Sequence, residues 1–99
     1  MVIKRPHRTT VEASLASALR RAGIRFTSKA NGFPGHPDFI LPGDQQLAVF
    51  VDGRPQTKRQ AAARRRLRRL GLATMTVPEL AIVADPDAVA ERIGRRAGQ

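Results

Sequence analysis

The fold of this chain is decided by the stretch LAVFV at residues 47–51. Five consecutive apolar residues predict a strand that is buried on both faces, which is typical of a central strand covered by helices on each side. The stretch ends at Asp52, where an unpaired carboxylate beside the core would be costly. A second acid, Asp38, follows a turn-rich segment at residues 32–37. These two aspartates are the candidate functional residues of the chain.

The residues before this stretch predict one helix and one strand. Apolar side chains at helical spacing run over residues 9–22, with a capping box formed by Thr9 and Glu12 at the start. Gly23 stops the helix. Residues 24–28 alternate apolar with polar side chains, as a half-buried strand does.

The central stretch belongs to a predicted hairpin. Residues 37–41 and residues 46–52 form its two strands around a Pro-Gly turn. Because a proline restricts the residue before it, we expect His36 in extended geometry and Asp38 near the first position of its strand. The hairpin thus carries one aspartate at the start of one strand and the other at the end of its neighbour.

The second half of the chain predicts a helix, a strand and a last helix. The first of these helices covers residues 56–70, and arginines crowd all but a narrow part of its surface. The narrow apolar stripe consists of Ala63, Leu67 and Leu70. Residues 72–77 form a further strand, and Asp85 before a proline reads as the N-cap of the last helix.

The order helix, strand, strand, strand, helix, strand, helix predicts an α/β fold, with a mixed central β-sheet flanked by helices. The 99 residues are enough for a single domain over residues 1–99. Residues 1–8 form a basic arm, which either lies along phosphates or is an ordinary frayed terminus. Residues 95–99 are expected to form a basic tail.

The composition excludes several kinds of site and favours a polyanionic partner. The chain has no cysteine and two histidines, which excludes disulfides, thiol catalysis, cysteine-ligated zinc and a histidine-rich metal site. We expect a soluble, cytoplasmic protein, because the sequence has no signal peptide and no apolar stretch of the roughly 20 residues that span a membrane. Eighteen Lys and Arg against eight Asp and Glu give a net charge of +10, which favours nucleic acid as the partner.

Several segments, in their order and spacing, resemble the very short patch repair (Vsr) endonucleases and the DUF559-like proteins of the PD-(D/E)xK nuclease superfamily. The segments are Glu12 on the first helix, LRRAGIRF at residues 19–26, PGHPDFILP at residues 34–42 and VFVDG at residues 49–53. Residues 66–72 and 85–87 look like the distal half of the same unit, so the likeness spans about residues 9–94. The resemblance implies a restriction-endonuclease-like α/β sandwich and a DNA endonuclease or nickase that depends on Mg²⁺ or Mn²⁺.

The resemblance also implies a metal site at the hairpin. Asp38 matches the family's principal metal-ligand aspartate, and Val51 matches a position that contributes its backbone carbonyl. Asp52 stands where the repair endonucleases have a catalytic histidine and the DUF559-like proteins have an aspartate before glycine. Carboxylate and carbonyl oxygens are the ligands that suit Mg²⁺. The structural alternatives are a capped turn for Asp38 and an Asp-Gly turn for Asp52.

Two further residues are candidates for catalysis. Glu12 resembles the helix-borne glutamate that approaches the metal through water in this superfamily, and the capping box explains it equally well. His36 lies two residues before Asp38, where it can act as a general base or phosphate donor, or be a solvated loop histidine. The superfamily's usual E-x-K element is absent, because Phe50 occupies the glutamate position.

The candidate contacts to nucleic acid come from two loops and from the arginine-rich helix. Phe33 is the residue placed to wedge between bases, and the chain has no Trp or Tyr, so recognition of a T:G mismatch is not carried over from the family. Arginines without acidic partners four residues away favour a polyanion over a plain solvated helix. The candidate phosphate contacts are Lys29, Arg54, Lys58, Arg59, Arg65, Arg66 and Arg69.

Three functions therefore stay open from the sequence. The first is the metal-dependent endonuclease or nickase, working as a homodimer or as a module of a larger assembly. The second is a DNA-binding module that keeps the nuclease fold and has lost catalysis. The third is a basic structural or regulatory protein that binds RNA or protein.

Overall fold

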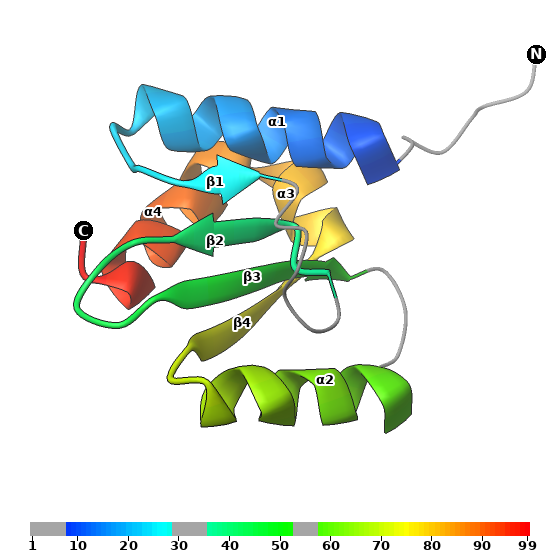
Figure 1. Cartoon of the computed structure of the whole chain (residues 1–99). Helices are drawn as coiled ribbons and strands as arrows, with labels where there is room; N and C mark the ends of the chain where they lie inside the picture. The colour runs from blue at the N-terminus through cyan, green and yellow to red at the C-terminus, as the bar shows by residue number, and fades with distance from the viewer. Residues whose placement is uncertain (1–7, 29–35, 53–57) are drawn as a thin grey trace, which may run out of the picture.

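A four-stranded sheet with the strand order β1-β2-β3-β4 forms the centre of the molecule (Figure 1). It is seen in a computed structural model that describes residues 8–28, 36–52 and 58–99. The side chains of Arg8, Thr9 and Asp52 lie outside this description. Within the described ranges no helix is both long enough and apolar enough to cross a membrane.

The sheet is mixed, as predicted. Its strands are β1 (Thr27–Ser28), β2 (Phe39–Leu41), β3 (Leu47–Asp52) and β4 (Ala73–Pro78). β1, β2 and β3 pair antiparallel, while β3 and β4 pair parallel across the helical crossover between them. All five residues of the stretch 47–51 are buried, which confirms β3 as a strand covered on both faces.

The helices cover the two faces of the sheet unequally. They are α1 (Arg8–Arg21), α2 (Lys58–Arg69), α3 (Glu79–Ala84) and α4 (Pro86–Ala97). Helices α1, α3 and α4 lie on one face, and α2 lies alone on the other (Figure 1). The chain is therefore a three-layer α/β sandwich with one thick and one thin helical layer.

Alternation along the strands divides the buried residues into two clusters. Odd-numbered residues of β2 and β3 face the larger cluster, together with Leu15 and Leu19 of α1 and Ile93 of α4. The even-numbered residues Ile40, Ala48 and Phe50 of the same strands face α2. This smaller cluster consists of Ile40, Ala48, Phe50, Leu67 and Leu72.

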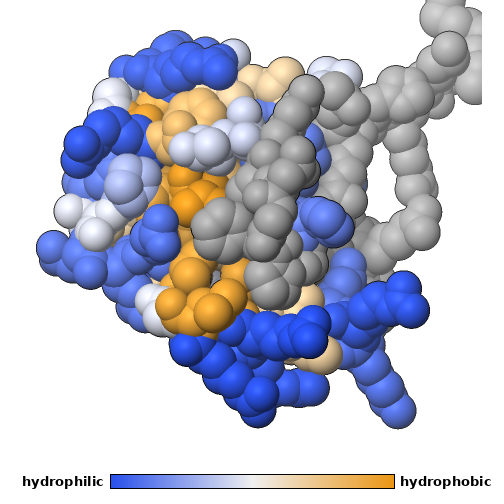
Figure 2. Space-filling model, viewed as in Figure 1, coloured by the Kyte–Doolittle hydropathy of each residue, from blue (hydrophilic) through white to orange (hydrophobic). Residues whose placement is uncertain are grey.

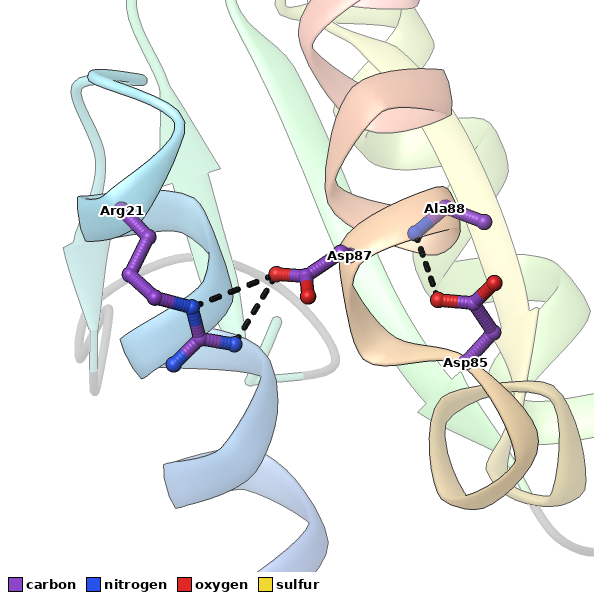
Figure 3. Close-up of polar contacts among 4 residues, drawn as sticks. All are labelled: Arg21, Asp85, Asp87 and Ala88. Atoms are coloured by element: carbon purple, nitrogen blue, oxygen red, sulfur yellow. Dashed lines mark hydrogen bonds and ion pairs between the residues drawn. The ribbon is translucent and has the colours of Figure 1, made fainter.

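The predicted helix stops are confirmed at Gly23 and Gly71. Both glycines have positive φ values, of 71° and 93°, which a residue without a Cβ adopts at little cost. After Gly23, the Ile24 N–H donates to the carbonyl of Leu19 at 2.9 Å, which is the long hydrogen bond of a Schellman motif. The N-cap of α4 is also confirmed, since the Asp85 carboxylate accepts from the Ala88 N–H at 3.1 Å (Figure 3).

Two helix ends differ from the sequence prediction, and one helix was not predicted. Helix α1 begins at Arg8, one residue before the predicted capping box, and the side chain of Thr9 in that box lies outside the described part of the chain. Helix α3 was not predicted, because its six residues follow Pro78 with no side-chain cap to signal a start. Residues 95–97 form the last turn of α4 and not a tail.

Gln99 explains why β1 is shorter than the predicted strand over residues 24–28. Its side-chain amide accepts from the Arg25 N–H at 2.8 Å and donates to the Arg25 carbonyl at 3.0 Å. The same amide donates to the carbonyl of Pro42 at 2.9 Å. The backbone groups of Arg25 are thus satisfied by a side chain, so strand pairing begins only at Thr27.

Candidate functional site

Asp38 is held at the point where β2 begins to pair with β3. Its N–H donates to the Val49 carbonyl at 2.9 Å, and its carboxylate Oδ2 accepts from the Val51 N–H at 2.6 Å. The side chain thereby takes the place of a strand partner for Val51 and is half-buried. The backbone bond to Val49 and the side-chain bond to Val51 together fix the place of Asp38 beside β3.

The structure brings Asp38 and Val51 together, two of the three residues predicted to bind the metal. In an antiparallel pair the N–H and C=O of one residue point to the same neighbour. The Val51 carbonyl therefore faces the same edge of β3 as the N–H that binds Asp38. A carboxylate and a strand carbonyl at one edge offer the hard oxygen ligands that Mg²⁺ prefers.

Asp52 is the last residue of β3, where its Cα is paired with Pro78 of β4. Its side chain lies outside the description, so a shared cation between Asp38 and Asp52 stays a prediction. Within the residues that the structure describes, no three His, Cys, Asp or Glu side chains cluster as a metal site.

The ends of several elements converge on this edge of the sheet. The start of α1, the start of β2, the end of β3 and the start of α2 all lie at the same end of the sheet (Figure 1). Glu12 stands in the first half of α1 and is half-buried. Its catalytic role and its capping-box role both stay predictions.

His36 is exposed and adopts a left-handed conformation, with a φ of 48°. The prediction of extended geometry at this residue is wrong. The following Pro37 is buried and Asp38 is bonded to β3, so the left-handed conformation falls on His36. Histidine is among the residues that enter the left-handed region more readily than most.

Helix α2 presents a basic surface to solvent. Figure 2 shows hydrophilic side chains along the lower edge of the molecule, where Figure 1 places α2. The exposed basic residues of this helix are Lys58, Arg59, Arg65, Arg66, Arg68 and Arg69. The other residues predicted to contact nucleic acid, Lys29, Phe33 and Arg54, fall outside the described ranges.

The buried side of α2 differs from the predicted stripe. Leu70 is 65% exposed, and the inward-facing residues of the helix are Arg64 and Leu67. Gly71 ends the helix and turns Leu72 into the cluster beside Leu67, so Leu70 is left outside. Arg64 and Leu67 are three residues apart and so lie on one helix face. This spacing was the signal in the sequence that could have identified Arg64 as an inward-facing residue.

Comparison with known proteins gave one finding. Residues 1–61 match the family model described as DNA mismatch endonuclease Vsr. This range contains α1, β1, β2, β3 and the start of α2, and therefore both candidate aspartates. No curated protein and no solved structure matched the chain.

Proposed function

The chain belongs to the Vsr family of DNA mismatch endonucleases, and we propose that it is a Mg²⁺-dependent endonuclease or nickase that acts on duplex DNA. The observation that carries this proposal is the bond between the Asp38 carboxylate and the Val51 N–H at 2.6 Å. That bond supports a site in which the Asp38 carboxylate and the Val51 carbonyl hold one Mg²⁺ or Mn²⁺ ion. Asp52 is proposed as the third ligand.

The chemistry at this site divides between the ion and the side chains. When bound, the ion polarises a phosphoryl oxygen and makes a water molecule nucleophilic at neutral pH. In this proposal Asp38 holds its carboxylate at the strand edge, and Asp52 or Glu12 orients the attacking water. His36 either accepts a proton from that water or donates a hydrogen bond to the phosphate.

Binding of the DNA backbone is assigned to α2. Its exposed basic side chains stand on the face of the sheet opposite α1, and its first turn lies at the same end of the sheet as the start of β2 (Figure 1). The proposed phosphate contacts in this helix are Lys58, Arg59, Arg65, Arg66 and Arg69. Lys29 and Arg54 are proposed as further phosphate contacts, and Phe33 is proposed to wedge between base pairs.

The experiment that tests this function is nicking of supercoiled plasmid by the wild type and by Asp38→Asn. Asparagine keeps an oxygen for the Val51 N–H but removes the charge that would hold the ion. We expect the wild type to nick the plasmid only in the presence of Mg²⁺ or Mn²⁺. The nicking rate of the variant should be lower by more than about 100-fold, because a loss up to about 100-fold is also seen when a residue that only supports a metal ligand is replaced. Asp87→Asn is the matched control, because Asp87 lies on α4 and pairs with Arg21 at the surface.

The outcome also separates the two rival functions. Undiminished gel shifts on duplex DNA without cleavage in either metal would leave a DNA-binding module. Equal or tighter binding to RNA of the same length, across several salt concentrations, would favour the RNA-binding alternative. Sedimentation at the concentrations used for cleavage tests whether the chain acts as a homodimer or as a module of a larger assembly.

A further inference from the structure

The two edges of the sheet differ in how they are closed. One edge is β1, whose two residues Thr27 and Ser28 pair with β2, and the Gln99 side chain satisfies the backbone of Arg25 beside it. Natural proteins often keep an edge strand this short to prevent further pairing. The other edge is β4, which is six residues long, and within the described ranges no strand lies on its outer side. The β4 edge is therefore the one that remains able to pair.

The backbone groups on the outer side of β4 come from two threonines. The Ala73 N–H donates to the carbonyl of Gln46 at 2.8 Å, so Ala73 faces β3. Because backbone groups alternate in direction along a strand, the N–H and C=O groups of Thr74 and Thr76 face away from β3. Thr76 is exposed and Thr74 is half-buried. Two donors and two acceptors thus stand at the open edge.

These free donors are arranged symmetrically about Met75. The next outward position before them is Leu72, whose N–H already donates to the carbonyl of Leu67 at 3.0 Å. The next outward position after them is Pro78, which has no N–H. The open part of the edge is therefore short and centred on Met75, and it has the same pattern when read from either end.

A symmetric edge of this kind matches the same edge of a second copy of the chain. In an antiparallel pair with a two-fold axis at Met75, Thr74 of each copy lies opposite Thr76 of the other. Each of these pairs exchanges two hydrogen bonds. A shift of the axis to either threonine would instead place a threonine opposite Leu72 or Pro78, neither of which has a free N–H. The register centred on Met75 is thus the one that the edge favours.

Exposed apolar side chains flank the same strand. Leu70, which is 65% exposed, precedes β4, while Leu80 and Val83 of α3, which are 81% and 54% exposed, follow it. They are the exposed large hydrophobic residues in the described part of the chain, and all three lie within seven residues of β4. Apolar residues gathered beside an open edge are typical of a surface that binds another protein.

The distribution of charge favours a second copy at this surface. Each copy has a net charge of +10, so two copies repel one another over most of their surface. Residues 70–84, which contain β4 and α3, have one charged residue, Glu79. In the register centred on Met75, Glu79 lies at the end of the edge where α2 of the second copy ends at Arg69. The two copies therefore meet where repulsion is weakest, with charges of opposite sign at each end.

We propose that two copies of this chain associate through the β4 edge, in a symmetric dimer whose β4 strands pair antiparallel about Met75. This gives the homodimer alternative a specific interface, and it holds whether or not the chain cleaves DNA. The dimer has one continuous sheet of eight strands, four from each copy. Because its two-fold axis is perpendicular to that sheet, both α2 helices lie on the same face and offer one DNA duplex two basic helices.

The first test is sedimentation of two matched lysine variants. Thr76 on β4 and Thr27 on β1 are both exposed on edge strands, and a lysine on an edge strand opposes pairing. We expect the wild type and Thr27→Lys to sediment as dimers that dissociate on dilution, and Thr76→Lys to sediment as a monomer at the same concentrations. A monomeric wild type, or a dimer that is equally strong in Thr76→Lys, would overturn the proposal.

The second test locates the interface by disulfide cross-linking. The chain has no cysteine, so a single introduced one reports on its own position. Residues opposed at the centre of this register have Cα atoms about 4.5 Å apart, which a disulfide spans. Mild oxidation should therefore give a covalent dimer of Met75→Cys and not of the matched variant Thr27→Cys, as seen by electrophoresis without reductant. A dimer by sedimentation whose Met75→Cys variant does not cross-link would contradict this interface.

A mixture of two further variants keeps the second test decisive if Met75→Cys unfolds easily. An equimolar mixture of Thr74→Cys and Thr76→Cys should form mixed disulfides in preference to disulfides between identical chains, because the two positions lie opposite each other across the axis. A preference for disulfides between identical chains would overturn the register.

The results distinguish failure of this inference from failure of the proposed function. Nicking of plasmid by a chain that stays monomeric would remove the β4 interface and leave the nuclease in place. A dimer that cross-links at Met75→Cys but does not nick DNA in Mg²⁺ or Mn²⁺ would leave the interface and remove the nuclease.

Discussion

The two faces of the sheet are built differently. Among the described residues, seventeen buried residues form the cluster under α1, α3 and α4, whereas five form the cluster under α2. The thick face, under α1, α3 and α4, is apolar throughout, and the thin face, under α2, contains a buried arginine. The thick face therefore supplies most of the hydrophobic stabilisation, since that stabilisation grows with the apolar area removed from water.

This difference separates stability from the proposed chemistry. Helices α1 and α4 stabilise the sheet by packing on one face, so the helix on the other face can carry many charged side chains. Basic side chains repel one another, and α2, which has few apolar contacts, carries seven of the eighteen Lys and Arg residues of the chain. The four predictions that follow compare the two faces, beginning with the largest expected effect.

Removing one leucine from each face should cost different amounts. Leu15 of α1 and Leu67 of α2 are both fully buried. We expect Leu15→Ala to lower the free energy of unfolding by about 4 kcal/mol and Leu67→Ala by about 2 kcal/mol, because a small cluster collapses into the space more readily. Urea unfolding followed by circular dichroism measures both. Equal losses would show that the two faces contribute equally to stability.

A second pair of variants tests how tightly the thick face is closed. A Cβ built on Gly43 would approach the backbone carbonyl of Ala97, whereas one on Gly94 would meet the flexible end of the Ile24 side chain. Gly43→Ala should therefore lower the free energy of unfolding by about 1 to 3 kcal/mol, and by more than Gly94→Ala. Thermal melting of the two variants side by side gives the comparison. The reverse order would mean that α4 moves easily relative to the turn before β3.

Nucleic-acid affinity should be confined to the thin face. Arg66 and Arg69 are exposed on α2, and Arg95 and Arg96 are exposed on α4. Replacing the α2 pair by alanine should reduce the slope of log affinity against log salt by roughly two, since each phosphate contact accounts for about 0.9. Replacing the α4 pair should leave the slope unchanged. Fluorescence anisotropy with labelled duplex DNA at several salt concentrations measures this slope. An equal reduction of the slope for both pairs would indicate that the DNA is attracted to the net charge of the protein and not to α2.

The smallest effect is expected at the ion pair between α1 and α4. Arg21 and Asp87 are joined at 2.9 Å, but their side chains are 57% and 67% exposed (Figure 3). Arg21→Ala should lower the free energy of unfolding by about 0.2 to 1 kcal/mol, and added salt should reduce that difference. Urea unfolding at low and high salt measures it. A loss above the range for exposed pairs would mean that this contact, and not the apolar cluster, fixes α4 on α1.

Local features of the sequence determined much of the fold. The unbroken apolar stretch at residues 47–51 identified the central strand, and the hairpin that pairs it with β2 followed from the turn before it. Gly23 and Gly71 marked two helix ends, and Asp85 marked a helix start, because each signal depends on a few neighbouring residues. Asp38 was likewise found from its place after a turn, and the structure bonds it to Val51.

Only the tertiary structure decided which side chains these elements bury and how the chain reverses between them. Helical periodicity allowed Leu70 on the inner side of α2, but the sheet lies against Arg64 and Leu67. His36 is left-handed because Pro37 and Asp38 are already held by β3 and the core, and Gln99 ends the pairing of β1 from 74 residues away. Propensity and spacing describe one segment at a time, whereas burial and long-range hydrogen bonds depend on what the rest of the chain places beside it.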